Sequence, residues 1–402
     1  MEKTALQDKL SSMNVVIASH VFASGPSLDL EEYLKDKVRY LLYIGHPFAE
    51  RTDVRSFCRE YRKGTLVRKH EAYPVRLSSF FVYFKEAFYT MFWLLFTREK
   101  IDLYIGSDNY MAYLGLLAKK TGRVRKVVLY TIDFVPKRFK NPALNWLYHF
   151  FDRECLNKCD MVWNVSSAIT QAREEYYRGL RRCAKQIVVP LGIWHDRISK
   201  LPFTKRSENK IIFLGHLLEK QGLSLVIEAL PLIARKLPSL KLVIIGTGPF
   251  ERHLKLLVAK LRVGRRVEFR GYVENHRDVE EELSDSTIAV AMYKPDPESF
   301  TYFADPAKIK NYLSAGLPVI LTDVPPIAEE IAQKRCALIA KYDVYDFADK
   351  VDALLTDRRM LSEYSKNAIK FAEQFDWDKV FTEALEKTLQ QPASSLLLKQ
   401  KN

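Results

Sequence analysis

Residues 293–322 of the chain, YKPDPESFTYFADPAKIKNYLSAGLPVILT, combine a loop, a helix and a strand. Asp305 is a favoured N-cap residue and Pro306 suits the first position of a helix, so a helix is predicted to begin there. Gly316 is predicted to end this helix before a buried apolar strand. The N–H groups at a helix start bind anions, and Lys308 lies on the first turn. Taken alone, the stretch is equally well explained as an ordinary helix–strand unit.

The composition indicates a globular chain with more than one domain. Its 402 residues are long for one domain and comfortable for two, and 48% of them are hydrophobic. The 5 cysteines are scattered and odd in number, which argues against a disulfide framework and, without a nearby Cys/His pair, against a metal site. No signal peptide is predicted, and no run approaches the roughly 18–20 apolar residues of a membrane span. We therefore expect a cytoplasmic protein.

The formal net charge of +14 predicts a polyanionic neighbour. The candidates are a phosphorylated ligand, an anionic lipid and a nucleic acid. The sequence contains no recognisable RNA- or DNA-binding module, so we expect no nucleic-acid partner.

Strand-like and helix-like segments alternate in two successive series along the chain. This pattern predicts an α/β protein of two Rossmann-like, doubly wound parallel-sheet domains that face each other across a cleft. The first domain is expected over residues 1–192 and the second over 209–375. Residues 193–208 are charged and lack periodicity, as a linker does, and 376–402 form a C-terminal helix and tail that can cross back to the first domain.

An aromatic segment, RLSSFFVYFKEAFYTMFWLLF, occupies residues 76–96 and is flanked by Arg98 and Lys100. Two interpretations remain open for its helix over residues 80–96. The helix is buried against the sheet, or it lies partly exposed in an anionic membrane interface with its basic flanks as anchors. In the second case the protein is peripheral on the inner face of the membrane.

Two residues of the first domain stand where predicted strands end. His20 lies in the loop after the first strand, and Asp133 closes the strand of residues 127–132 in a loop rich in Lys and Arg. Ligands of parallel α/β sheets bind at these carboxyl ends. A structural loop histidine and a salt-bridged aspartate explain the same residues equally well.

Five segments of the second half follow one another in a characteristic order. They are VPLG (189–192), FLGHLLEKQG (213–222), VIIGTGP (243–249), VEFRGYV (267–273) and KIKNYLSAGLPV (308–319). In this order and spacing they resemble the nucleotide-sugar domain of group 1 (family-four-like) glycosyltransferases of the GT-B superfamily, in a divergent branch. The first half is similar to the family in pattern only.

The resemblance implies a metal-independent transfer of a sugar from a nucleoside diphosphate sugar, a UDP-sugar above all, to an acceptor hydroxyl. No cofactor is implied beyond this co-substrate. The acceptor is expected to be lipid-linked or a saccharide, in cell-surface polysaccharide or glycolipid synthesis, and inverting or retaining stereochemistry stays open. The alternatives within the same fold are a catalytically inactive scaffold subunit and a nucleotide-sugar epimerase or phosphorylase.

A leaving diphosphate needs cations and free N–H groups. The resemblance assigns the diphosphate to Gly215, His216, Lys220, Pro306, Ala307 and Lys308. It assigns the nucleoside to Gly248, Tyr272, Val273 and Asn311. The chain departs from the family where His216 and Gln221 replace the usual Arg and Lys, and where Phe303 and Asn311 replace two Glu residues.

The acceptor side is less specific. An inverting transfer needs a base, for which Asp133 is the first candidate, as base or acceptor binder, and His20 the second. Contacts to the acceptor or to the transferred sugar are expected from Gly25, Ser27, Ser107, Asp108, Glu298 and Asp305.

Overall fold

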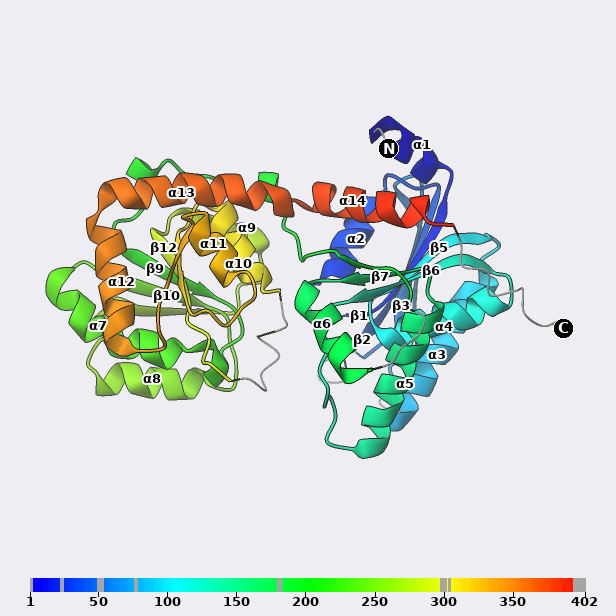
Figure 1. Cartoon of the computed structure of the whole chain (residues 1–402), viewed down its shortest axis with the longest axis horizontal. Helices are drawn as coiled ribbons and strands as arrows, with labels where there is room; N and C mark the ends of the chain where they lie inside the picture. The colour runs from blue at the N-terminus through cyan, green and yellow to red at the C-terminus, as the bar shows by residue number, and fades with distance from the viewer. Residues whose placement is uncertain are drawn as a thin grey trace. The chain divides into compact units, whose positions relative to one another are not determined.

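The computed structural model describes residues 3–21, 25–48, 54–75, 79–178, 183–296, 302 and 305–392. The chain divides into two compact units (Figure 1). Unit 1 comprises Met1–Pro190 and Trp377–Asn402, and unit 2 comprises Leu191–Asp376. The predicted linker segment, 193–208, contains two short 3-10 turns and belongs to unit 2.

Unit 1 contains an eight-stranded sheet with the strand order β4-β3-β2-β1-β5-β6-β7-β8. The strands are β1 (Asn14–Val21), β2 (Tyr40–Pro47), β3 (Phe57–Arg62), β4 (Thr65–Glu71), β5 (Ile101–Gly106), β6 (Val124–Thr131), β7 (Met161–Asn164) and β8 (Gln186–Val188). β1, β2, β5 and β6 pair in parallel and are buried at nearly every position, as their unbroken apolar runs predict.

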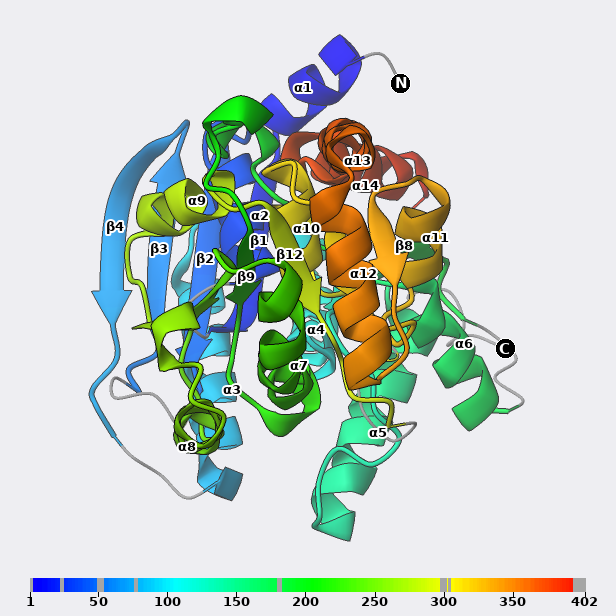
Figure 2. The ribbon, with the colours of Figure 1, turned by 90° about the vertical axis from the view of Figure 1, so that its left-hand side faces the viewer.

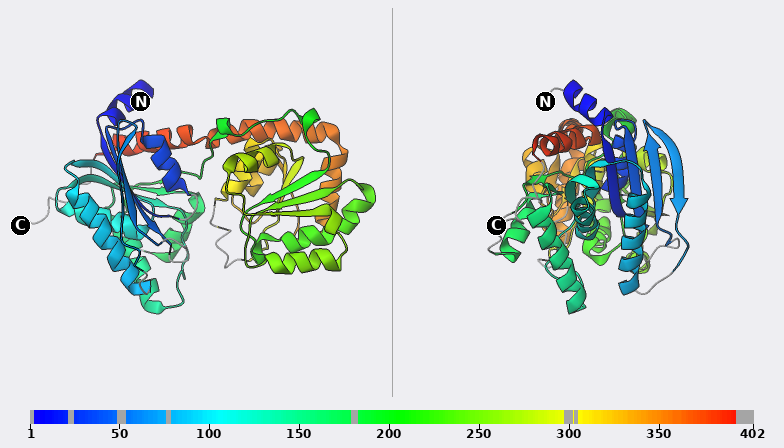
Figure 3. Two further views of the ribbon diagram at one scale, coloured as in Figure 1. Left: turned by 180° about the vertical axis from the view of Figure 1, so that it is seen from behind. Right: turned by 90° about the vertical axis from the view of Figure 1, so that its right-hand side faces the viewer.

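The helices of unit 1 are α1 (Lys3–Ser11), α2 (Pro26–Leu34), α3 (Ser79–Phe96), α4 (Asn109–Lys120), α5 (Pro142–Lys158), α6 (Ser167–Tyr176) and α14 (Trp377–Gln390). Both views in Figure 3 and the view in Figure 1 place α3, α4 and α5 beside one another. α14 packs in unit 1, where Trp163 Nε1 donates a hydrogen bond of 2.9 Å to Thr388 Oγ1. The C-terminal helix is therefore part of the first unit's core.

The β3–β4 hairpin was not predicted from the sequence. It pairs antiparallel with β2 at the edge of the sheet, and β4 is exposed along its whole length. Lys63 and Gly64 form the tight turn with φ values of 49° and 83°. Because the hairpin is rich in charged side chains and β4 is exposed, it leaves no long apolar run in the sequence.

Unit 2 contains a six-stranded sheet with the order β11-β10-β9-β12-β13-β14, all parallel. The strands are β9 (Lys210–Leu214), β10 (Lys241–Ile245), β11 (Val267–Gly271), β12 (Ile288–Ala291), β13 (Val319–Leu321) and β14 (Ala337–Ile339). This is the doubly wound Rossmann order, in which the direction of winding reverses between β9 and β12. The predicted α/β fold class is confirmed.

Alternate residues of β9 face opposite sides of this sheet. Ile211 and Phe213 belong to one apolar cluster, with α7 (Leu223–Lys236), α8 (Glu251–Lys260) and α12 (Val344–Thr356). Ile212 belongs to the other cluster, with α9 (His276–Ser284), α10 (Ala307–Ser314), α11 (Ala328–Gln333) and α13 (Arg358–Ala372). Figure 2 shows α7 and α12 in front of the strands, with α10 behind them.

The helix predicted near Asp305 is α10, and its start differs from the prediction. Pro306 is the N-cap and the helix begins at Ala307, so the prediction that Asp305 caps it is wrong. Asp305 instead accepts a hydrogen bond of 2.7 Å from the Leu191 N–H and pairs with Lys310, whose ammonium is fully buried. A buried ammonium without a carboxylate partner costs more free energy than a missing N-cap hydrogen bond, so Asp305 pairs with Lys310 instead of capping the helix.

Candidate active site

The amino group of Lys308 lies where the winding of unit 2 reverses. Its Nζ is 4.3 Å from the ring centroid of Phe213 in β9 and 4.7 Å from that of Tyr293, which follows β12. It donates a hydrogen bond of 2.5 Å to Gln221 Oε1. A Cβ on Gly215 would lie 3.8 Å from Nζ, so the loop after β9 passes close to the amine. Ligands of doubly wound sheets bind at this reversal point.

Burial lowers the pKa of Lys308 to about 7. The amine therefore loses much of its charge at neutral pH unless an anion binds beside it. A diphosphate would supply that anion and restore the charge.

The loops after β9 and β10 are held together by close backbone contacts. Leu217 N donates to Thr247 O at 2.9 Å. A Cβ on Gly248 would lie 2.3 Å from Leu217 O and 2.7 Å from His216 Cδ2, so only glycine fits there. The structure thus brings Gly215, His216 and Gly248 together next to Lys308, and His216 is exposed.

Other predicted donor residues surround the same strand ends. Pro306 and Ala307 form the half-buried start of α10, and Asn311 is half-buried one turn further on. Lys220 is half-buried in the loop after β9; burial lowers its pKa, which the nearby Asp296 partly counters.

Tyr272 and Val273 lie farther away, after the edge strand β11. Tyr272 is 65% exposed, whereas Val273 packs against the core of unit 2. Asp305 is occupied by its ion pair with the buried Lys310 of α10. Glu298 and Phe303 lie outside the described residues.

A second polar cluster lies in unit 1, where the winding of that sheet reverses between β1 and β5. His20 Nδ1 is 2.7 Å from Asp108 Oδ2, and His20 Nε2 is 3.1 Å from Glu86 Oε2. Asp108 caps α4 with its other oxygen, which accepts from Met111 N at 2.8 Å. Asp108 and His20 are therefore held by the fold in one orientation.

The two carboxylates control the charge of His20. Burial lowers the pKa of His20, but the charges and hydrogen bonds of Asp108 and Glu86 outweigh it and raise the pKa to about 10. Burial likewise raises the pKa of Asp108, and the His20 charge overcomes this, so that its net pKa is lowered. At neutral pH the site holds an imidazolium between two carboxylates.

Other candidates of unit 1 differ in their surroundings. Ser107 is buried, and within the described residues its hydroxyl has no hydrogen-bond partner. Ser27 is also buried, but its hydroxyl is 3.2 Å from the Tyr43 hydroxyl. Gly25 precedes α2 and has open space around its Cα. Ser107 is therefore the candidate whose buried hydroxyl is left without a partner among the described residues.

Asp133 forms an ion pair near this cluster. Its two carboxylate oxygens accept hydrogen bonds of 2.9 and 2.8 Å from Arg138 Nη1. The Asp133 side chain is 46% exposed. The carboxylate is thus neutralised by a neighbour in the same loop.

Sequence reasoning missed two residues of these clusters. Glu86 is the single acid in the aromatic helix α3, and a lone carboxylate among aromatic side chains is a signal that was available. Gln221 was noted as a departure from the family pattern, but its contact with Lys308, 87 positions away, was not predicted.

One side of α3 is exposed, and it carries large apolar side chains. They are Phe81, Phe84, Phe88, Phe92, Leu95 and Phe96. The opposite side is buried through Glu86, Thr90, Trp93 and Leu94. The buried side fits the interpretation that the helix packs against the sheet, and the exposed side fits the interpretation that it lies in a membrane interface.

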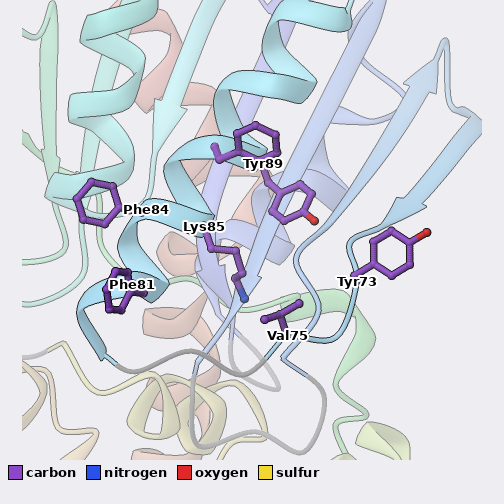
Figure 4. A pocket seen from close by; sticks show the side chains of 7 residues that line it. Tyr73, Val75, Phe81, Phe84, Lys85 and Tyr89 are labelled. Carbon is purple, nitrogen blue, oxygen red and sulfur yellow. The ribbon is translucent and has the colours of Figure 1, made fainter.

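A cavity of about 400 Å³ adjoins the N-terminal part of α3. Lys85 and Tyr89 project from α3 toward the segment that carries Tyr73 and Val75, whereas Phe84 projects away from it (Figure 4). None of the helices in the described part of the chain combines the length and apolar character needed to cross a bilayer.

Solved structures of known proteins share the fold of this chain over nearly its whole length. A UDP-forming α,α-trehalose-phosphate synthase from Burkholderia xenovorans has a similar structure, with a TM-score of 0.71 and 12% identity over 94% of this chain and 99% of that one. Anabaena HepE, solved with UDP, gives a TM-score of 0.67 and 15% identity over 93% of this chain and 99% of that one. The fold is that of the GT-B glycosyltransferases.

Residues 196–371 match the family model described as Glycosyl transferases group 1. A putative colanic acid biosynthesis glycosyltransferase of Escherichia coli (strain K12) is 27% identical over 177 residues. The match covers 42% of this chain and 42% of that relative. The predicted resemblance to a divergent group 1 member is confirmed.

Proposed function

We propose that the protein is a glycosyltransferase that moves a sugar from a UDP-sugar to an acceptor hydroxyl without a bound metal ion. The observation that carries the proposal is Lys308, an amine with lowered pKa at the reversal point of unit 2. Similar folds include HepE, which was solved with UDP.

Each part of the donor has a proposed partner. Lys308, the N–H groups at the start of α10 and the loop of Gly215, His216 and Lys220 take the diphosphate. Asn311 takes a ribose hydroxyl, because its amide both donates and accepts hydrogen bonds. The nucleobase of the donor is assigned to Tyr272 and Val273, which follow β11, and to Gly248.

Replacing Lys308 by Ala is expected to weaken UDP binding about 10- to 100-fold, as for the loss of one charge-assisted hydrogen bond. Binding to the wild type should also weaken by up to roughly tenfold per pH unit above about pH 7, since the amine must regain its proton. Lys308→Arg keeps its charge and should show no such pH dependence. Calorimetric titration between pH 7 and 9 measures all three proteins.

Lys236→Ala is the matched control for this titration. It removes an exposed lysine whose partner is Asp352 on α12. The control should bind UDP as the wild type does. Equal UDP affinities of wild type and Lys308→Ala would refute the role of Lys308.

The acceptor hydroxyl is proposed to bind in unit 1 beside His20, Asp108 and Ser107. His20 is favoured over Asp133 as the base, because Asp133 is half exposed and paired with Arg138. His20 is an imidazolium at neutral pH, so it acts as a base only after it has given up one of its two ring protons. Asp133 and Gly25 remain candidates for acceptor contacts. A protein that neither hydrolyses nor transfers any nucleoside diphosphate sugar would instead be the inactive scaffold.

The acceptor is further proposed to be lipid-linked, in glycolipid or cell-surface polysaccharide synthesis, with the protein peripheral on the inner face of an anionic membrane. The exposed aromatic side of α3 supports this, since such a side suits a bilayer interface. Arg98 and Lys100, both exposed, follow the helix and suit anionic headgroups.

Vesicle flotation tests the membrane proposal. The wild type should float with vesicles of phosphatidylcholine and phosphatidylglycerol, and salt should weaken this association. Phe84→Ser and Phe88→Ser should each reduce it roughly tenfold, because each removes a large apolar contact. Leu256→Ser removes an exposed leucine of unit 2 and should change nothing. A wild type that stays unbound with and without anionic lipid would contradict the membrane proposal.

A further inference from the structure

The described residues that line the cavity of about 400 Å³ beside α3 all belong to unit 1. α3 contributes Lys85, Phe88 and Tyr89 to the wall, and the segment after β4 contributes Tyr73 and Val75. In Figure 4, Lys85 and Tyr89 project from the helix toward that segment. Ligand sites in proteins commonly measure roughly 300–1,000 Å³, so the cavity has room for a small ligand or for part of a chain molecule.

The wall of this cavity is mainly aromatic and apolar. Phe88 and Tyr73 are 61% and 81% exposed, so the cavity is open to solvent. Tyr89 is half-buried, and its ring centroid lies 5.2 Å from that of Trp93 on the buried side of α3. Such a wall favours a hydrocarbon ligand, because apolar surface of both partners then leaves water.

Lys85 brings a positive charge into this apolar wall. Its side chain is half-buried, and its Nζ donates a hydrogen bond of 3.0 Å to Val54 O. Within the described part of the chain no carboxylate pairs with Lys85, since the neighbouring Glu86 pairs with His20. An ammonium has three N–H donors, so the bond to one carbonyl leaves donors for an anion. The cavity therefore offers apolar walls and an ammonium side by side.

We propose that the cavity binds one molecule of a lipid phosphate, whose hydrocarbon chain lies between α3 and the segment of Tyr73 and Val75 and whose phosphate pairs with Lys85. A lipid phosphate carries both the apolar chain and the anion that this wall complements. A free saccharide or a nucleotide lacks the chain, and a neutral lipid lacks the anion. The inference rests on the proposed lipid-linked acceptor and names its class, a hydrocarbon chain that ends in a phosphate.

The cavity adjoins the exposed apolar side of α3. Phe88 lines the cavity and also belongs to that side. Its ring centroid is 5.8 Å from that of Phe92, and the centroid of Phe92 is 4.3 Å from that of Phe96. A lipid whose bilayer contacts these rings can therefore insert its chain into the cavity along a continuous apolar surface.

Calorimetric titration of the full chain with octyl phosphate, a soluble lipid phosphate with a single chain, tests this inference. The wild type should bind it with a stoichiometry of one. Lys85→Met keeps an apolar side chain but removes the charge, so it should weaken the binding about tenfold or more. Octanol should bind the wild type and Lys85→Met equally, and inorganic phosphate alone should bind neither. Lys85→Gln, which can still donate to Val54 O, replaces Lys85→Met if that variant fails to fold.

Matched variants separate the cavity from the surface around it. Val75→Trp places a large side chain in the cavity and should weaken the binding of octyl phosphate and octanol alike. Phe92→Ser removes an exposed ring of α3 that does not line the cavity, so it should reduce vesicle flotation but leave octyl phosphate binding unchanged. Lys120→Met removes an exposed lysine at the end of α4 and should also leave this binding unchanged.

Two results would overturn the inference. They are a wild type that does not bind octyl phosphate at millimolar concentration, and equal octyl phosphate affinities of the wild type and Lys85→Met. Neither result affects the proposed transfer from a UDP-sugar, which is measured separately. A wild type that binds octyl phosphate through Lys85 but transfers no sugar would overturn the proposed function and leave the lipid phosphate site standing.

Discussion

Asp152→Asn is expected to destabilise unit 1 by about 3–5 kcal/mol, the cost of breaking a buried ion pair. Arg173 and Asp152 are 2% and 1% exposed. Arg173 Nε and Nη2 donate to the carboxylate at 3.1 and 2.6 Å, and further bonds go to Asn164 and Thr131. A guanidinium keeps its charge in a protein, so the variant leaves an unpaired cation in the core.

Denaturant unfolding measures this loss. Replacing both partners, as in Asp152→Leu with Arg173→Met, should cost less than the single change, since no buried charge is left. A single variant that unfolds at the wild-type denaturant concentration would contradict the account of this pair. The pair also fixes Thr131 at the end of β6, directly before the loop of Asp133.

His20→Ala is expected to lower turnover by about 10²- to 10⁴-fold, the usual contribution of a general base. Donor affinity should be unchanged, because the proposed donor residues lie in unit 2. Asp133→Asn is the matched comparison and should keep most of the activity. Release of UDP from the donor in the presence of acceptor measures both variants.

The two variants also decide between the two candidate bases. Loss of turnover in Asp133→Asn with full activity in His20→Ala would assign the role to Asp133, as the sequence first favoured. The anomeric configuration of the product, read by NMR, then shows whether the transfer inverts or retains.

The sequence predicted the fold well wherever burial shapes composition. The central strands, such as β1 and β6, are buried at nearly every position and contain apolar runs, because helices cover both faces of their sheet. The β3–β4 hairpin was missed because it lies at the exposed edge. The N-cap of α10 was wrongly predicted at Asp305 for a different reason. The Asp305 carboxylate pairs with the buried amine of Lys310, five positions later.

The candidate site was predictable only in part. Lys308 and Asn311 followed from a resemblance in motif order, which local sequence carries. The partners of Lys308 and His20 did not, because Gln221 lies 87 positions from Lys308 and Glu86 lies 66 positions from His20. Such pairs depend on strand order and helix rotation, which no single segment encodes.

Thermal unfolding with and without UDP tests the central claim most directly, because a ligand that binds only the folded state must stabilise it. We predict that UDP raises the unfolding temperature of the wild type in a saturable way and raises that of Lys308→Ala much less at the same concentration. Equal unfolding temperatures of the wild type with and without saturating UDP would contradict the proposed donor site at Lys308.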